Sequence, residues 1–154
     1  MNTSNTIKKL QQTDDNKASI ILRITFSIMM LAHAAGKVFG IFGGLGLEKT
    51  IHHMTENMGV PYIFAVIAIL VEFFSTLAII VGYQTRINAL LLVTLMTVAA
   101  TFHMKNGFYM NWFGQNAGEG FEFHILAVGM MLALAILGGG KYSLDYMSTK
   151  KDLK

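Results

Sequence analysis

Four long apolar runs constrain the fold of this chain more than any other feature of its sequence. They cover about residues 18–42, 62–82, 86–104 and 121–138. A helix that crosses a bilayer needs about 20 apolar residues, because each residue adds ~1.5 Å to its length. None of the runs has the continuous polar face expected of a helix on the surface of a soluble protein. The pattern therefore predicts an all-α integral membrane protein, built as a four-transmembrane-helix bundle.

The composition supports the same fold class. The chain has 154 residues, of which 53% are hydrophobic and 14% charged, whereas soluble domains carry about 25% charged residues. A soluble chain of this size cannot bury so much apolar surface. The sequence contains no cysteine, which excludes disulfides, cysteine-ligated metals and thiol redox chemistry within the chain. Any redox role would therefore need a quinone, another cofactor or a partner subunit.

The distribution of Lys and Arg predicts the orientation in the membrane. The tails and the short turn between the second and third runs contain eight such residues: Lys8, Lys9, Lys17, Arg86, Lys141, Lys150, Lys151 and Lys154. The two opposite loops contain only Lys49 and Lys105. Both termini are therefore expected to be cytoplasmic, in a multi-pass protein of the cell inner membrane. Residues 1–17 are interpreted as a polar cytoplasmic tail, disordered or lying on the surface, 18–146 as the membrane domain and 147–154 as a basic cytoplasmic tail.

Local signals predict how the helices are joined. Residues 82–86 form a tight turn in which Thr85 is placed to cap the third helix. Three glycines at 138–140 end the fourth helix. The second outer loop, about residues 105–120, contains the aromatic residues Phe108, Tyr109, Trp112 and Phe113. They are typical of an aromatic belt at the membrane interface; the alternative is a lid over a ligand site.

Ionisable side chains inside a membrane span are costly, and each is a functional-site hypothesis by default. Arg23 lies about one and a half turns into the first run, and Glu72 lies near the middle of the second. The long Arg stem could cover the remaining gap, so a buried ion pair between Arg23 and Glu72 is predicted. The pair would either fix the register of the bundle or leave the carboxylate to relay protons or bind a polar head group.

A second polar set lies at a similar depth near the outer ends of the runs. It consists of His33, Lys37, His103 and Glu122, which we predict to be candidate ligand-binding residues. The alternative is that these side chains separately reach the interface along their apolar stems. No metal site is predicted: His52, His53, His103 and His124 could supply imidazoles, but adjacent histidines cannot easily bind one ion with good geometry. Catalytic residues stay unassigned, and no nucleic-acid partner is expected.

The sequence resembles DoxX-like membrane proteins from about residue 19 to residue 145. The resemblance rests on the order and spacing of several segments: Leu22-Arg23, His33-x-x-Gly36-Lys37, Val71-Glu72-Phe73-Phe74, Gly82-Tyr83-Gln84-Thr85-Arg86, His103-x-x-Asn106-Gly107-Phe108, Glu122 and Gly140-Lys141-Tyr142-Ser143-Leu144-Asp145. Ala34 stands where such proteins usually have Gly. The resemblance implies a four-helix membrane bundle. Some such proteins are small subunits of a thiosulfate:quinone oxidoreductase, and others are linked to redox-stress complexes with sulfurtransferase or superoxide dismutase partners.

Three functional hypotheses follow. The first is a redox-associated subunit, not catalytic on its own, that binds a quinone-like or other small ligand in the outer half of the bundle. It would receive electrons from a soluble redox or sulfurtransferase-type partner, and it could form a homo-oligomer. The second is a non-enzymatic membrane anchor or scaffold for a soluble partner. The third is a small carrier of a lipid or weak acid. Four short helices are poorly suited to alternating access unless the chain oligomerises, so this hypothesis ranks last.

Overall fold

The structure, a computed structural model, describes residues 10–152 and the side chains of residues 10–150. Within this range all regular secondary structure is helical. The four long helices are α2 (Ala18–Phe39), α4 (Tyr62–Val81), α5 (Thr85–His103) and α6 (Glu122–Leu137). They match the four predicted runs, except that α2 ends at Phe39 rather than near residue 42. Three helices, α2, α4 and α5 with its extension to Asn106, are long and apolar enough to cross a membrane, whereas α6 is apolar but has only 16 residues.

Shorter helices occupy the connections. Between α2 and α4 lie α3 (Leu47–His52) and the π-helix η1 (His53–Asn57), and α5 continues into the 3-10 helix η2 (Met104–Asn106). A last helix, α7 (Leu144–Asp152), follows α6. Because α7 is continuous through residue 146, the predicted boundary between the membrane domain and the C-terminal tail is not a break in secondary structure.

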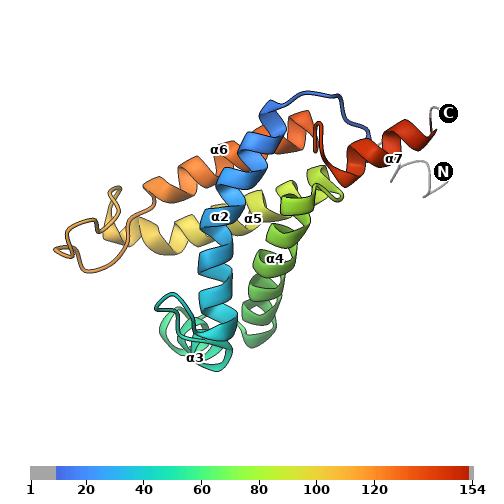
Figure 1. Ribbon diagram of the computed structural model, residues 1–154. Coiled ribbons are helices and arrows are strands. Elements are labelled where there is room, and N and C mark those ends of the chain that lie inside the picture. Colours follow the sequence, from blue (N-terminus) through green and yellow to red (C-terminus); the bar gives the residue numbers. More distant parts are fainter. Residues whose placement is uncertain (1–9, 153–154) are drawn as a thin grey trace.

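The long helices form two antiparallel hairpins. α2 packs along α4 and α5 along α6, and α4 also packs against α5. Figure 1 shows that the hairpins cross, so that α3 and the loop between α5 and α6 lie apart. In each hairpin we call the end that carries its connecting loop, residues 40–61 or 104–121, the loop end. The opposite end, at residues 82–85 and 138–145, is called the turn end.

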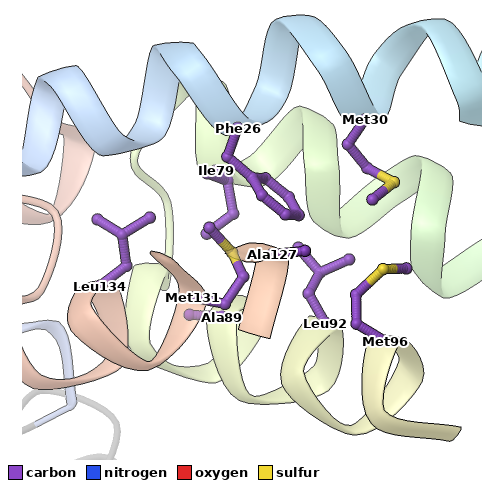
Figure 2. Packing of buried hydrophobic residues seen from close by; sticks show 9 residues of the cluster. All are labelled: Phe26, Met30, Ile79, Ala89, Leu92, Met96, Ala127, Met131 and Leu134. Atoms are coloured by element: carbon purple, nitrogen blue, oxygen red, sulfur yellow. The ribbon is translucent and has the colours of Figure 1, made fainter. Parts of the chain in front are cut away.

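An apolar core holds the hairpins together where they cross. Each of the four long helices contributes to it, and Figure 2 shows its members: Phe26 and Met30 from α2, Ile79 from α4, Ala89, Leu92 and Met96 from α5, and Ala127, Met131 and Leu134 from α6. Three of the nine are methionines, whose flexible thioether side chains fill irregular gaps between helices that cross.

Arg23 ties the turn end together and has a different role from the one predicted. Its Nε donates to the carbonyl of Ile79 at 2.9 Å and its Nη2 to that of Ile80 at 2.6 Å. Its Nη1 donates to the carbonyl of Gly139 at 3.0 Å. The guanidinium thus caps the C-terminal end of α4, where carbonyl groups lack helical partners and the helix dipole favours a cation. The predicted Arg23–Glu72 ion pair is therefore wrong, because Arg23 points to the turn end.

A carboxylate from the far end of the chain caps α5. The two oxygens of Asp145 accept hydrogen bonds from the backbone N–H groups of Gln84 and Thr85, each at 2.8 Å. The structure shows no side-chain cap at the start of α5 from its own N-cap residue, Gln84, so the capping role predicted for Thr85 falls to Asp145. Gly82 makes this contact possible: its φ is +69°, and a Cβ there would lie 2.4 Å from the Cβ of Ser143.

The described part of the N-terminal segment lies against the turn end. The hydroxyl of Thr13 donates to the carbonyl of Leu137 at 3.2 Å and accepts from the N–H of Gly140 at 2.9 Å. Residues 10–17 therefore follow the surface-lying form of the predicted tail, while residues 1–9 lie outside the described part of the chain. Arg86 caps α6 in the same region by donating to the carbonyls of Ala135 and Ile136.

Candidate functional site

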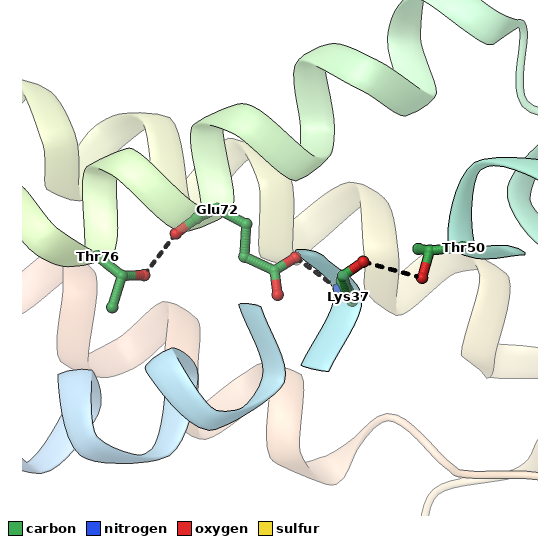
Figure 3. A network of polar contacts seen from close by, with 4 residues as sticks. All are labelled: Lys37, Thr50, Glu72 and Thr76. Atoms are coloured by element: carbon green, nitrogen blue, oxygen red, sulfur yellow. Dashed lines mark hydrogen bonds and ion pairs between the residues drawn. The ribbon is translucent and has the colours of Figure 1, made fainter. Parts of the chain in front are cut away.

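An ion pair between Lys37 and Glu72 lies between α2 and α4. Lys37 Nζ and Glu72 Oε2 are 2.5 Å apart, and Figure 3 shows the two side chains meeting between the helices. The Glu72 side chain is 4% exposed and that of Lys37 is 40% exposed. Glu72 lies on the buried face of α4, which also carries Ala65, Ser75 and Thr76. Such small residues let two helices approach closely around a polar group.

The backbone at the end of α2 brings the ion pair together with α3. Gly44 folds back onto Gly36 so closely that a Cβ on Gly44 would lie 2.3 Å from the Gly36 backbone. The carbonyl of Gly36 accepts from the N–H groups of Gly40 and Gly46 at 3.0 and 3.1 Å. This turn places α3 beside α2, and the hydroxyl of Thr50 donates to the carbonyl of Lys37 at 3.4 Å.

Aromatic and imidazole rings gather beside α6. The ring centroids of His103 and His124 are 4.8 Å apart, and those of His33 and Phe123 are 5.9 Å apart. Phe123 also contacts His124 edge to face at 5.7 Å. These ring contacts join His33 of α2 and His103 of α5 to the start of α6. The structure thus brings together three helices, α2, α5 and α6, around His124.

The loop between α5 and α6 fixes the orientation of His103. Nδ1 of His103 lies 3.0 Å from the carbonyl oxygen of Glu119. Because a carbonyl oxygen only accepts hydrogen bonds, Nδ1 of His103 is the donor in this contact. The same carbonyl also accepts from the side-chain amide of Asn106 at 2.9 Å.

Two buried polar atoms in this region have no hydrogen-bond partner among the described residues. They are Oε1 of Glu72 and Nδ1 of His124, and His124 is only 7% exposed. The other such atoms are the hydroxyls of Ser27 and Thr85. Leaving a buried polar group unpaired costs about 1–3 kcal/mol, and more for a charged group. Glu72 and His124 therefore mark places where a ligand or water would gain hydrogen bonds.

The four predicted ligand-binding residues, His33, Lys37, His103 and Glu122, lie toward the loop end, but Glu122 has a different role. Oε1 of Glu122 accepts from the N–H of Met110 and from Nε1 of Trp112, both at 2.9 Å. We therefore assign Glu122 to the loop. The loop-end cluster, as we use the term below, consists of His33, Lys37, Glu72, His103 and His124.

Sequence reasoning left His124 out of the candidate ligand site and paired Glu72 with the wrong cation. The sequence signal that could have identified His124 is its spacing from Glu122. Two residues along a helix rotate the side chain by about 200°, so His124 lies on the opposite face of the same helix end. No group of three His, Asp or Glu side chains within residues 10–152 is arranged to hold a metal ion. His53, on η1, has its Nδ1 2.9 Å from the side-chain amide of Asn57.

Long apolar helices with charged and imidazole side chains enclosed between them define an α-helical membrane protein. The chain belongs to the DoxX family, whose model matches residues 18–105. It is 34% identical over 137 residues to the inner membrane protein YqjF of Escherichia coli (strain K12), an alignment that covers 86% of this chain and 92% of that relative. It is a multi-pass protein of the cell inner membrane. No solved structure matches the chain.

Proposed function

We propose that this protein is a redox-associated subunit that binds a quinone-like molecule at the loop-end cluster. The observation that carries the proposal is the pair of unpartnered buried atoms, Glu72 Oε1 and His124 Nδ1. A carboxylate oxygen accepts hydrogen bonds, so Glu72 calls for a donor such as a hydroxyl. An imidazole nitrogen either donates or accepts, according to its tautomer. A small molecule with hydroxyl or carbonyl oxygens on an apolar ring matches both atoms.

The surroundings suit an aromatic ring. The imidazole centroids of His103 and His124 lie 4.8 Å apart with the rings tilted by 33°, and Phe123 adds a ring that contacts both His33 and His124. Aromatic neighbours favour a flat ligand through offset or edge contacts worth about 0.5–1.5 kcal/mol each. The binding region therefore combines an apolar, aromatic wall with a few polar groups, as small-molecule sites do.

A bound quinone would supply redox chemistry in which electron transfer is coupled to protons. Within the chain, His and Glu side chains are the groups that hold or move such protons. The ammonium of Lys37 would favour negative charge on a ligand oxygen, and its partner Glu72 would hold a ligand hydroxyl. The electrons would come from a soluble redox or sulfurtransferase-type partner.

We further propose four membrane spans with both termini cytoplasmic, which places the loop-end cluster in the outer half of the bilayer. The support is the excess of Lys and Arg in the tails, at the turn end and at the adjoining Arg86, eight residues against two in the loops. The absence of cysteine makes the test direct. Single cysteines placed at the exposed positions His52 and Ser148 should react differently with a membrane-impermeant maleimide added to whole cells. Labelling of His52→Cys alone is expected, and labelling of Ser148→Cys alone would reverse the orientation.

The proposed ligand is tested by mass spectrometry of organic extracts from the purified protein. The informative variant is Lys37→Gln/Glu72→Gln, which removes both charges and keeps the side-chain lengths similar. Its matched control is Glu48→Gln/Lys49→Gln, the same substitutions at exposed positions on α3. We expect a quinone in the wild type and the control, and its loss from the folded site variant.

The opposite result has a defined meaning. If wild-type protein extracted with mild detergent contains no quinone and binds none when quinone is added back, the proposal is wrong. The role as a membrane anchor for a soluble partner would then be favoured, and uptake of a lipid or weak acid into proteoliposomes would identify a carrier.

A further inference from the structure

The loop between α5 and α6 ends in a cluster of exposed aromatic side chains. Tyr109, Trp112 and Phe113 are 71%, 76% and 88% exposed. We call residues 107–118 the aromatic tip; this segment contains no Asp, Glu, Lys or Arg. A hollow of about 260 Å³ in the tip is lined both by these rings and by the amides of Asn111, Gln115 and Asn116. The exposed surface is therefore uncharged and mixes aromatic with amide groups.

Two carboxylates hold the tip in a defined conformation. Oε1 of Glu122 accepts from the N–H of Met110 and from the indole Nε1 of Trp112, both at 2.9 Å. Oε2 of Glu119 accepts from the N–H of Asn111 at 2.8 Å. The tip is thus held by Glu122, the first residue of α6, and by Glu119 in the loop just before this helix.

Three further backbone N–H groups of the tip donate within the loop. The N–H of Trp112 donates to the carbonyl of Met110 at 2.9 Å, and that of Gly114 donates to the carbonyl of Asn111 at 3.1 Å. The N–H of Asn116 donates to the side chain of Asn111 at 2.9 Å. A loop in water needs no such internal pairing, because water satisfies its backbone, whereas a segment that enters a membrane does.

The length of α6 places the tip near the membrane boundary. With 16 residues, α6 is about 24 Å long, which is about 6 Å less than the ~30 Å hydrocarbon core. Its turn end is capped by Arg86, which donates to the carbonyls of Ala135 and Ile136, and a guanidinium is expected to lie at or near the opposite interface. The chain that precedes α6 must therefore cross the rest of the hydrocarbon boundary, and that chain is the loop that carries the aromatic tip.

We propose that the aromatic tip inserts into the interfacial region of the leaflet on the loop side, with its rings among the lipid head groups and upper acyl chains. Tryptophan and tyrosine favour this depth, because their rings are apolar and carry one polar group. The missing charges, the backbone N–H groups paired within the loop and the short α6 all suit lipid as the occupant. The tip would thereby complete the fourth crossing and hold the loop whose Glu119 carbonyl orients His103.

The fluorescence of Trp112 tests the proposal in the intact protein, because it is the chain's single tryptophan. Wild-type protein is reconstituted into liposomes, and quenching by lipids brominated at different acyl-chain depths is compared with quenching by aqueous iodide. The background control is Trp112→Phe. A position control is Trp112→Phe/Ser148→Trp, which moves the indole to an exposed position on α7.

We expect strong quenching of Trp112 by the shallowest brominated lipids and little by iodide, with the reverse order for the indole at residue 148. Strong quenching by iodide without quenching by brominated lipids would overturn the proposal and point to a loop in water, available to a soluble partner. Protection from both quenchers would also overturn it, since the tip would then be covered by protein, such as a second copy of the chain.

Discussion

The two side chains of the Lys37–Glu72 ion pair differ in burial, so replacing one or the other should not change the stability of the protein equally. The Glu72 side chain is 4% exposed, whereas that of Lys37 is 40% exposed. Lys37→Met leaves a buried carboxylate without its cation, a change that typically costs about 3–5 kcal/mol. Glu72→Gln leaves an ammonium whose flexible stem can reach water or head groups, so its cost is expected to be about 1.5–3 kcal/mol, that of a lost hydrogen bond to a charged group.

The double variant Lys37→Met/Glu72→Gln separates the ion pair from the individual side chains. Neither charge is then present, so the penalty for an unpaired buried carboxylate disappears. We expect the double variant to be more stable than Lys37→Met alone. Residues in direct contact show coupling energies of about 0.5–3 kcal/mol in such cycles, and the short contact between Lys37 and Glu72 should place this pair in the upper half of that range.

The assay is thermal unfolding of the four proteins in one detergent, followed by far-UV circular dichroism. A change of 1 kcal/mol shifts the Tm of a chain of about this size by about 2–4 °C, so Lys37→Met should lower the Tm by about 6–20 °C. The matched control, Glu48→Gln/Lys49→Gln, should leave it nearly unchanged because both residues are exposed. Equal effects of the two single substitutions, or strictly additive effects in the double variant, would refute the argument from burial.

Three further outcomes follow from contacts at the two ends of the molecule. Gly82→Ala should lower the Tm more than Gly59→Ala. Both residues have φ +69°, but only at Gly82 would the new Cβ meet a side-chain atom, at 2.4 Å, and this clash adds about 1–3 kcal/mol of destabilisation. Equal Tm values would contradict the close packing. Asp145→Ala should cost about 1–2 kcal/mol by chemical or thermal unfolding, because α5 loses its cap; an unchanged stability would show that the cap is dispensable. Glu122→Ala should lower the fluorescence anisotropy of Trp112, because the indole loses its acceptor; an unchanged anisotropy would show that other contacts hold the ring.

The helices could be predicted from the sequence because the signals that define them are local. Continuous apolar runs and the glycines after them set the ends of α4 and α6, which the structure places at Val81 and Leu137. The end of α2 was placed about three residues too late, because Gly40 ends the helix with φ +71° before the apolar run itself stops at residue 42. Apolar composition marks where a helix can continue, and the glycine decides where it ends.

The polar contacts were harder to predict, because they depend on the register in which the helices pack. Estimating depth by counting residues along the helices placed Arg23 within reach of Glu72. In the α2–α4 hairpin the antiparallel pairing instead places Lys37 beside Glu72 and Arg23 at the end of α4. The cap of α5 shows the same limit: Asp145 lies 60 residues beyond Thr85 in sequence, and no local pattern connects the two.

The motifs that carry the resemblance to the DoxX family therefore divide by what their polar atoms do in the structure. Arg23 and Asp145 have their groups engaged by helix ends, and Glu122 is engaged by the loop. Such residues hold the fold, and replacing them should change stability before it changes any activity. Glu72 differs, because one of its carboxylate oxygens is buried without a partner among residues 10–152; the same holds for the hydroxyl of Thr85 and, outside these motifs, for Nδ1 of His124. An unpaired buried group costs stability, and a charged group costs more than a neutral one. A partner gained on binding would offset that cost at Glu72 and His124, and these two side chains are where we expect the function of this protein to be found.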